Sequence, residues 1–546
     1  MPWNQAYDPL GNWLLSTLLA ALPILVLLGA LAFFRVKAHA AALLGLASSF
    51  LVAVLVFGMP AAKACAVAVF GAAYGLFPIG WIILNVIFLY TLAENQGLFG
   101  VLRDSLTRVT EDRRLQLLLI AFSFGAFFEG AAGFGTPVAV TAAILIGLGF
   151  NPLSASGLSL IANTAPVAFG ALGTPILALQ GVTGLPLRAL SAQVGRILPF
   201  FSVLIPLWLV WAFAGLGGMA GVWPALLVAG VFFAVPQFLV SNFHGPWLVD
   251  IIASIVSLAA LVIFLLIWKP KRVWGLEGQE NGRAARAEIK HSRSEVVRAW
   301  TPWAVLSAVV CLWGIPEVRG FLDGIFVLRI PVPGVDRLIL RVPPVVSRPA
   351  AEAAVFSFNI LSFTGTGILA ASLISAWAMG SRMRDIIRAW RATVVRVRYS
   401  LLTVAAMLSL AFVTRYAGLD VTLGLAFART GVLYPFFGTL LGWLGVVLTG
   451  SDTSSNVLFG SLQKISAEQI GVSPVLMASA NSCGGVMGKM INAQSIVVAS
   501  TATRWYGHEG QILRYVFFHS LILASLVGLF ALLMAYVFPF TRLVVR

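Results

Sequence analysis

Long apolar runs separated by short polar segments constrain this chain more than any other feature of its sequence. The first runs cover about residues 13–34, 40–58 and 64–92, and similar runs recur to about residue 539. A run of about 20 apolar residues is long enough to cross the hydrocarbon core of a bilayer as a helix. Because backbone N–H and C=O groups find no water inside lipid, such runs must form helices. The sequence therefore predicts an all-α polytopic membrane protein.

The composition excludes a soluble globular protein. Of the 546 residues, 60% are hydrophobic and only 10% are charged, whereas about 25% of a typical soluble domain is charged. The net charge of +16 comes from Lys and Arg in short clusters between apolar runs. The positive-inside rule accounts for such clusters, so no nucleic-acid partner is predicted. The three cysteines lack metal-ligand spacing, and we expect no disulfide framework, no metal site and no cofactor.

The segment from Phe122 to Pro137, FSFGAFFEGAAGFGTP, combines helix-breaking residues with a central carboxylate, Glu129. Its glycines and terminal proline predict that the helix is interrupted here. An ionisable group in such a segment costs about 2.5–3.5 kcal/mol on insertion scales, so it usually faces a cavity on an ion or substrate path. A structural carboxylate bonded to a neighbouring helix is the alternative interpretation.

The positions of basic residues predict a topology. The first twelve residues lack the basic region of a signal peptide, so the first run is predicted to be a retained span. Basic residues at 35–37, at 103–114 and in the linker 269–298 mark the cytoplasmic side, which places the N-terminus outside. An odd number of apolar runs separates the last two markers. An odd number of crossings would bring the chain out on the opposite side, whereas both markers are assigned to the cytoplasm. The two agree if the run 117–150, which holds Glu129, is a re-entrant hairpin that does not cross.

The second half has a similar layout. A proline-rich segment, 317–353, is predicted to be an external loop, and the arginine-rich cluster 382–398 returns the chain to the cytoplasm. The polar segment Thr449–Asn456, TGSDTSSN, then interrupts the apolar runs and contains Asp452. A second hairpin here enters from the outside, opposite to the first. The result is an inverted repeat, the usual plan of secondary transporters.

A short internal match agrees with a repeat. NTAPVAFG begins at Asn163, 34 residues after Glu129, and NSCGGVMG begins at Asn481, 29 residues after Asp452; each has Asn, a hydroxyl residue and a Gly seven positions on. We interpret both segments as discontinuous helices whose free N-termini attract an anion. The alternative is that their small residues serve close helix packing.

Together these patterns predict about 12 transmembrane helices plus two re-entrant hairpins. The predicted parts are a first repeat, a cytoplasmic linker and a second repeat, each repeat with one hairpin and one broken helix. Their bounds are 1–268 (hairpin about 117–150, broken helix about 152–180), 269–298, and 299–546 (hairpin about 433–465, broken helix about 475–503).

Several long motifs resemble those of the lactate permease family of bacterial inner-membrane transporters, and they cover nearly the whole chain. They are FEGAAGFGTPVAV (128–140), NTAPVAFGALGTPIL (163–177), RVPPVVS (341–347), LTGSDTSSN (448–456) and GGVMGKMINAQSI (484–496). The resemblance implies uptake of L-lactate, often with D-lactate and glycolate, coupled to protons. It also implies kinship with a superfamily of inverted repeats, several of whose members work by an elevator motion. One departure is Asn492-Ala493, where a Ser-Pro pair is expected.

A 2-hydroxymonocarboxylate needs N–H donors or a cation for its carboxylate and an amide or hydroxyl for its 2-OH. A buried carboxylate suits the proton, because burial favours its neutral form. Glu129 is the predicted proton carrier and Asp452 the second choice. Lys489 either attracts the substrate or pairs with one of these carboxylates. The candidate substrate-binding residues are Asn163, Thr164, Thr453, Ser454, Asn456, Asn481, Ser482, Lys489 and Gln494.

Other ionisable residues have simpler interpretations. His244 is a possible proton relay but is more simply an interfacial histidine, and Arg196 and Asp250 read as boundary charges at the starts of spans. Catalytic motifs are missing from the sequence, so an enzyme is not predicted. A sodium-coupled transporter of another small carboxylate or anion stays open as an alternative. The predicted partners are the substrate, a proton and the lipid bilayer, and both a monomer and a homodimer stay open.

Overall fold

The computed structural model describes residues 2–545, apart from 33, 35, 99, 102–108, 132, 134, 276–291, 345, 347 and 506–507. Seven helices in this part of the chain are long and apolar enough to cross a membrane, or nine if each of two bent helix pairs is one span. Four more apolar helices fall below 18 described residues. The chain is mostly helical, as expected, but its described part also contains five short strands, and the expected number of about 12 spans exceeds the number that meets this length criterion.

The first half begins with apolar helices. Strand β1 (Trp3–Asn4) precedes α1 (Trp13–Ala32) and α2 (Ala38–Leu55), and then α3 (Ala61–Tyr74), η1 (Gly75–Gly80) and α4 (Trp81–Asn95) follow one another without a gap. Phe77 has non-helical dihedral angles inside this run and precedes Pro78. A residue before proline is pushed out of the helical region, which accounts for the interruption at η1.

A helical hairpin, residues 118–147, holds Glu129. Its first arm consists of η2 (Leu118–Phe124) and α7 (Gly125–Ala131) and follows the short α6 (Arg113–Leu117); its second arm is α8 (Thr136–Gly147). Gly133 and Gly135 between the arms have φ of 59° and 82°, a region that favours glycine. A side chain at Gly125 would lie 3.1 Å from Thr141 of the other arm, so the two arms pack together.

A broken helix follows the first hairpin. Asn151 caps α9 (Pro152–Ala162), and the chain then turns through η3 (Val167–Phe169) into α10 (Gly170–Thr183), with a bend of 61° between the two parts. Three long helices complete this half, namely α11 (Leu187–Ala220), α12 (Trp223–Phe243) and α13 (Val249–Ile267). Past the linker, α14 (Arg293–Gly314) starts with a capping box of Ser292 and Glu295.

The expected external loop, 317–353, is largely ordered structure. It contains α15 (Pro316–Ile325), β2 (Leu328–Pro331), β3 (Ile339–Arg341) and β4 (Ala350–Ala351), and β5 (Val355–Phe358) follows. β2 pairs antiparallel with β5, and β3 pairs antiparallel with β4 and parallel with β1. Backbone pairing thus ties the segment to the N-terminus, which its proline content did not indicate.

The second half contains a long arginine-rich helix and a second hairpin. After α16 (Thr364–Ala378), the arginine cluster 382–398 forms the first half of the 35-residue α17 (Met383–Ala417). Helix α18 (Leu419–Ala428) comes next. The chain then turns by 113° into η4 (Gly431–Leu433), which continues directly into α19 (Tyr434–Thr449). The second hairpin, residues 434–470, joins α19 to α20 (Asp452–Ile470), and Ser455 donates a hydrogen bond of 2.9 Å to the carbonyl of Gly442 across it.

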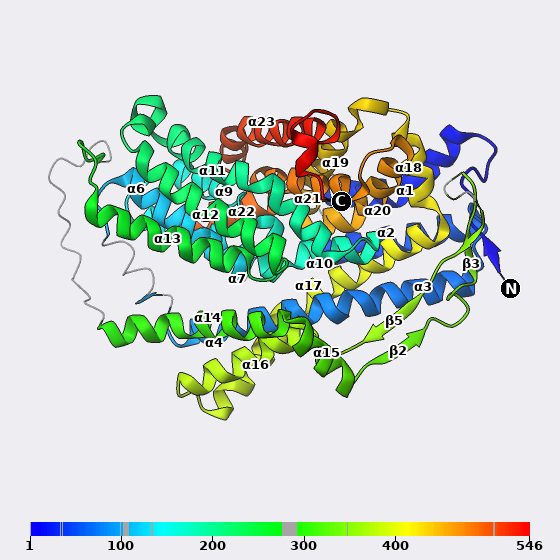
Figure 1. Ribbon diagram of the computed structural model, residues 1–546, viewed down its shortest axis with the longest axis horizontal. Helices are drawn as coiled ribbons and strands as arrows, with labels where there is room; N and C mark the ends of the chain where they lie inside the picture. The colour runs from blue at the N-terminus through cyan, green and yellow to red at the C-terminus, as the bar shows by residue number, and fades with distance from the viewer. Residues whose placement is uncertain are drawn as a thin grey trace.

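A second broken helix follows, made of α21 (Pro474–Gly488), η5 (Lys489–Ile491) and α22 (Ala493–Ala502). Helix α23 (Glu509–Tyr536) and η6 (Phe540–Leu543) end the chain. Figure 1 shows both hairpins and both broken helices in one thick body with α11–α13 and α23. Helices α4, α14 and α16 form a separate layer along its lower side, and α3 and α17 run between the layer and the body.

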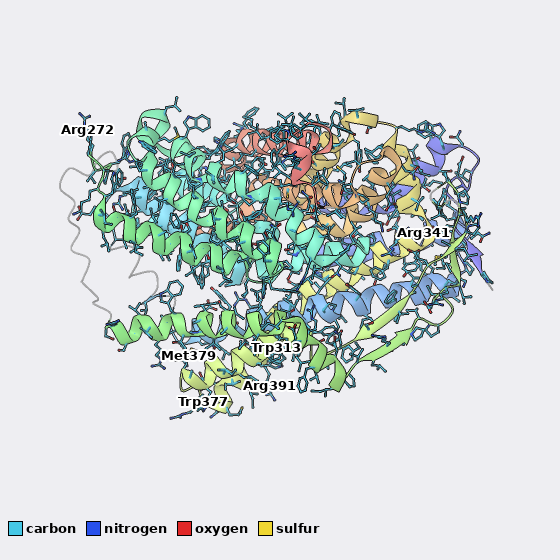
Figure 2. All side chains as sticks on the ribbon, viewed as in Figure 1. Arg272, Trp313, Arg341, Trp377, Met379 and Arg391 are labelled. Carbon is cyan, nitrogen blue, oxygen red and sulfur yellow. The ribbon has the colours of Figure 1, made fainter. Side chains whose placement is uncertain are left out.

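Large apolar side chains cover much of the outer surface, as a membrane protein requires. Leu266 and Ile267 of α13 and Trp377 of α16 are 76%, 86% and 82% exposed. Figure 2 shows Trp377 at the outer side of α16. Apolar side chains in such positions face lipid without cost, whereas water would oppose them.

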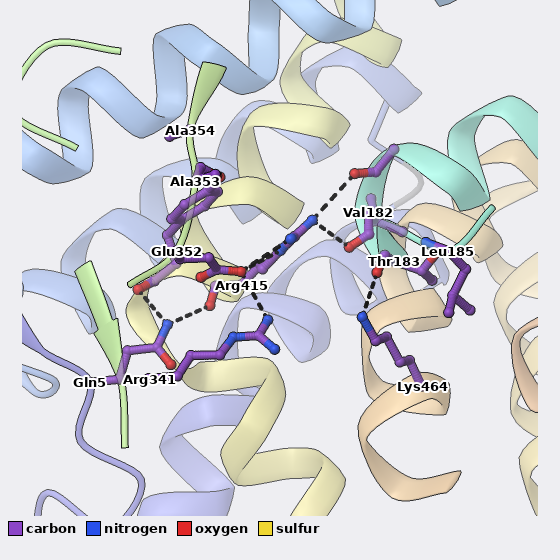
Figure 3. A network of polar contacts seen from close by, with 12 residues as sticks. Gln5, Val182, Thr183, Leu185, Arg341, Glu352, Ala353, Ala354, Arg415 and Lys464 are labelled. Atoms are coloured by element: carbon purple, nitrogen blue, oxygen red, sulfur yellow. Dashed lines mark hydrogen bonds and ion pairs between the residues drawn. The ribbon is translucent and has the colours of Figure 1, made fainter. Parts of the chain in front are cut away.

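A polar network ties distant segments together at one end of the molecule (Figure 3). Arg415 of α17 pairs with Glu352 at 3.1 Å and donates to the carbonyl of Val182, in the last turn of α10, at 3.0 Å. Arg341 pairs with the same carboxylate at 2.9 Å, and Lys464 of α20 donates to another carbonyl in that last turn. Cations at a helix C-terminus interact favourably with its dipole.

Glycines allow α19 and α21 to approach closely. Gly438 and Gly442 lie four residues apart on α19, as do Gly484 and Gly488 on α21. A side chain at Gly484 would collide with the backbone carbonyl of Thr439. Small residues at this spacing are typical of tight helix contacts in membranes.

We expect Gly484→Val to lower the thermal unfolding temperature of the purified protein in detergent. Overpacking a tight contact costs about 1–3 kcal/mol. Gly29→Val on α1 is the matched control, since an added Cβ there meets no described atom within 4 Å. Equal unfolding temperatures for the two variants would contradict the proposed contact.

Candidate functional site

A cavity of about 160 Å³ lies where the two hairpins and the two broken helices meet. One water occupies about 30 Å³ in the liquid, so the cavity has room for a small solute. Its walls come from five segments, four of them in the body and the fifth α17. The lining residues are Glu129, Gly133 and Gly135; Val167, Gly170, Ala171, Thr174 and Pro175; Ser400, Thr403 and Val404; Thr449 to Ser454; and Lys489, Ser495 and Val498.

Four helices begin at this cavity. Gly135 precedes α8, Ser451 caps α20, Thr174 lies in the first part of α10, and Ser495 lies in the first turn of α22. The first N–H groups of a helix have no partner inside the helix, and the helix dipole places partial positive charge there. Converging N-termini of this kind favour an anion in the cavity.

The backbone at the start of α10 is left-handed for three residues in a row. Ala171, Leu172 and Gly173 have φ of 44°, 53° and 76°. The left-handed conformation costs about 1–2 kcal/mol for each residue with a side chain, so the surrounding packing must hold it. Thr174 donates a hydrogen bond of 2.6 Å to the carbonyl of Ala171, and Gly173 leaves no room for a side chain beside Pro246. The helix is therefore broken beside the cavity.

Glu129 is buried in α7 and lines the cavity. Its Oε2 accepts no hydrogen bond from the described residues. The Asn163 side chain faces the carboxylate, and Lys489 attracts it electrostatically. Gly170 lies so close that a Cβ there would be 2.5 Å from Oε1.

Asp452, the first residue of α20, is better provided with hydrogen bonds. Its Oδ2 accepts from Ser482 at 2.5 Å and from Asn456 at 3.3 Å. Lys489 donates to the carbonyl of Gly450 at 2.6 Å and attracts both Asp452 and Glu129 without an ion pair within 4 Å in the described part of the chain. The lysine is therefore a single buried cation shared by two carboxylates at the cavity wall.

The other sequence-predicted residues differ in their positions. Thr453 and Ser454 line the cavity. Asn456, Asn481 and Ser482 lie behind Asp452, where Asn481 donates to Asn456 at 3.0 Å. Thr164 does not line the cavity, because its hydroxyl donates to the carbonyl of Ile161. The side chain of Gln494 lies outside the described residues.

Two features of the site were missed by the sequence analysis. Ser400 and Thr403 of α17 line the cavity, and their only signal was that hydroxyl residues follow an arginine cluster. Asp250, interpreted as a boundary charge, is 1% exposed and lies against Gly130, so that interpretation is wrong. The α12–α13 turn packs into the interior, and the start of α13 does not reach the surface.

Asn492, the departure from the expected Ser-Pro pair, caps α22. Its Oδ1 accepts a hydrogen bond of 3.1 Å from the backbone N–H of Ser495, and its Nδ2 donates to the carbonyl of Val447. Asparagine is among the most favourable N-cap residues. The helix is thus still interrupted at this position, with Asn492 as the N-cap residue where a Ser-Pro pair was expected.

The chain matches a known family over nearly its whole length. A family model described as L-lactate permease matches residues 16–538. The chain belongs to the L-lactate permease family. It is 47% identical over 542 residues to the L-lactate permease of Escherichia coli K12 and 46% identical over 553 residues to the glycolate permease GlcA of the same strain, and in both cases 98% of each chain is covered. The L-lactate permease of Bacillus subtilis 168 is 45% identical over 558 residues, with 98% of this chain and 99% of the relative covered.

Among solved structures, MtrF of Neisseria gonorrhoeae, of a class of antimetabolite efflux pumps, matches with a TM-score of 0.46 and 14% identity, covering 85% of this chain and 82% of that chain. The YdaH transporter of Alcanivorax borkumensis matches with a TM-score of 0.45 and 14% identity, covering 85% and 86%. The family assignment rests on the sequence relatives. This member of the L-lactate permease family is a multi-pass membrane protein, and its relatives are named permeases rather than enzymes.

We expect Gly170→Ala to reduce transport at least tenfold while leaving the unfolding temperature nearly unchanged. The added methyl group would displace the Glu129 carboxylate, and a tenfold loss corresponds to about 1.4 kcal/mol. The control is Gly217→Ala on α11, where an added Cβ meets no described atom within 4 Å. Uptake of labelled substrate into proteoliposomes checks this prediction, and wild-type rates in Gly170→Ala would contradict it.

Proposed function

We propose that this protein imports L-lactate, together with D-lactate and glycolate, across the bacterial inner membrane by proton symport. The observation that carries the proposal is the cavity in which four helix N-termini and Lys489 face two buried carboxylates. Relatives of nearly equal length named L-lactate permease and glycolate permease support the choice of substrate.

The cavity has the groups that a small 2-hydroxy acid requires. The helix starts at Gly135 and Ser451 and the ammonium group of Lys489 suit a carboxylate. The hydroxyls of Thr453, Ser454 and Thr403 suit the 2-OH group of the substrate. Hydroxyl groups donate and accept, so they match a substrate hydroxyl without specifying the configuration of its carbon.

Glu129 is the proposed proton carrier, and Asp452 is the second choice. Asp452 accepts two hydrogen bonds, which favour its charged form, whereas Oε2 of Glu129 accepts none among the described residues. A proton on Glu129 leaves Lys489 free to attract the substrate carboxylate, so proton and anion bind together. Their joint movement carries no net charge.

The proposed transport cycle uses the two halves as an inverted repeat. In it the repeats 1–268 and 299–546 each contribute one re-entrant hairpin and one broken helix, the linker 269–298 is cytoplasmic and the N-terminus is periplasmic. The arrangement of body and layer in Figure 1 suits an elevator motion, in which the body carries the cavity past the layer. The alternative function is sodium-coupled transport of another small carboxylate, because carboxylate and hydroxyl oxygens at the cavity also suit Na⁺.

We expect purified protein in sodium-free proteoliposomes to accumulate labelled L-lactate when an inward proton gradient is applied. A protonophore should abolish the accumulation, since the gradient is its only energy source. Empty liposomes are the control. Accumulation that needs Na⁺, or that survives the protonophore, would favour the sodium-coupled alternative.

We expect Glu129→Gln to exchange lactate across the membrane at near wild-type rates but to lose proton-driven accumulation. Glutamine keeps the size of the side chain and cannot release a proton. Asp452→Asn, measured beside it, separates the two candidates, because only the carrier should lose accumulation while keeping exchange. An unchanged accumulation level in Glu129→Gln would rule that residue out.

A further inference from the structure

Asp250 is a second buried carboxylate beside Glu129 that the proposed cycle does not yet use. It lies in the first turn of α13 and is 1% exposed, and neither of its carboxylate oxygens has a hydrogen-bond partner among the described residues. It lies against Gly130, the residue after Glu129, where an added Cβ would be 2.8 Å from the Cβ of Asp250. A negative charge on Glu129 disfavours a second negative charge on Asp250.

Cations are missing from the helices around Asp250. Helix α13 packs mainly on η2, α7, α10 and α12, and Glu129 is the one charged residue in those four elements. Trp247, three residues before Asp250, has its ring edge-on to His244 at 5.9 Å and beneath the guanidinium of Arg319 at 5.4 Å. Lys489 lies at the cavity and acts on Glu129 and Asp452.

Two adjoining carboxylates that are buried without a cation between them cannot both carry charge, and such pairs share one proton. The dipole of α13 favours a charge on Asp250, whereas Lys489 favours a charge on Glu129. Each carboxylate thus has a source of positive potential nearby, so one can carry the negative charge while the other holds the proton.

We propose that Asp250 is a second proton-carrying residue, which shares one proton with Glu129 and holds it away from the substrate cavity. The step breaks the O–H bond of the Glu129 carboxyl group and forms an O–H bond on Asp250, so Glu129 becomes the anion and Asp250 becomes neutral. This inference rests on the proposed proton symport.

The positions of the two carboxylates explain how the proton transfer would affect substrate binding. Glu129 lines the cavity and Asp250 does not. A proton on Glu129 lets Lys489 attract the substrate carboxylate, and its transfer to Asp250 restores the anion that competes for the lysine. The side-chain amide of Asn163, which faces Glu129 and has no standard hydrogen bond within the described chain, is available to donate to that anion. The position of one proton thus sets the strength of substrate binding.

The test is Asp250→Asn in proteoliposomes, with Ser254→Ala as the matched control one turn further along α13. Ser254 is equally buried, and its hydroxyl bonds only to the carbonyl of Ile251 in its own helix. We expect Asp250→Asn to keep lactate exchange within twofold of wild type, to lose at least tenfold in proton-driven accumulation, and to unfold at the wild-type temperature or above. Ser254→Ala should behave as wild type in all three measurements.

Two readouts separate a proton-carrying role from a structural one. The infrared C=O band of a protonated carboxyl group should be present in the wild type and change in both Glu129→Gln and Asp250→Asn. The double variant should lose no more accumulation than either single variant, because groups that share one proton act as a unit. Wild-type accumulation in Asp250→Asn, or additive losses in the double variant, would overturn the inference. Failure of the wild type itself to accumulate lactate would instead overturn the proposed symport.

Discussion

The structure depends on ending helices inside the apolar interior, where unpaired backbone groups are costly. At two of the helix starts a side chain accepts a hydrogen bond from a backbone N–H of the first turn: Ser451 caps α20 and Asn492 caps α22. At α10 the chain reaches the same result through three left-handed residues that Pro246 and Thr174 hold in place. N–H groups that would be costly to leave unpaired in lipid are thereby available as donors for the anion of the proposed function. The cavity is thus a direct consequence of where the helices stop.

The charged groups of the cavity are likewise held without a close ion pair among the described residues. Lys489 lies between Glu129 and Asp452 without a close ion pair to either in the described chain, so it can attract a third anion. A buried pair at contact distance would leave little attraction for a ligand. In the proposed cycle, protonation of one carboxylate, or transfer of that proton to Asp250, changes how much of this attraction is available. Substrate binding and proton binding would then be coupled by a few fixed charges.

The sequence predicts those features that depend on local chemistry. Run length alone predicts the helical membrane fold, and the glycines of FEGAAGFGTP mark the interruption at which Gly133 and Gly135 adopt positive φ. Features that depend on packing between distant segments could not be predicted. The residue pattern of α17 says nothing about which site Ser400 and Thr403 face, and Asp250 has the sequence position of a boundary charge although its helix begins in the interior. The same holds for the paired strands in 317–353.

Helix α17 connects the cavity to the polar network at the end of α10. Its middle lines the cavity through Ser400, Thr403 and Val404, and its last turn holds the carbonyl of Val182 through Arg415. It is fixed to α3, because Gly71 of α3 touches its backbone and leaves no room for a side chain. In the proposed elevator motion, movement of the broken helices past α17 would remove one wall of the cavity and break the bond of Arg415 to Val182 in the same step. Water can replace that bond at small net cost, so in the proposed motion the network would hold one position of the body without preventing its movement.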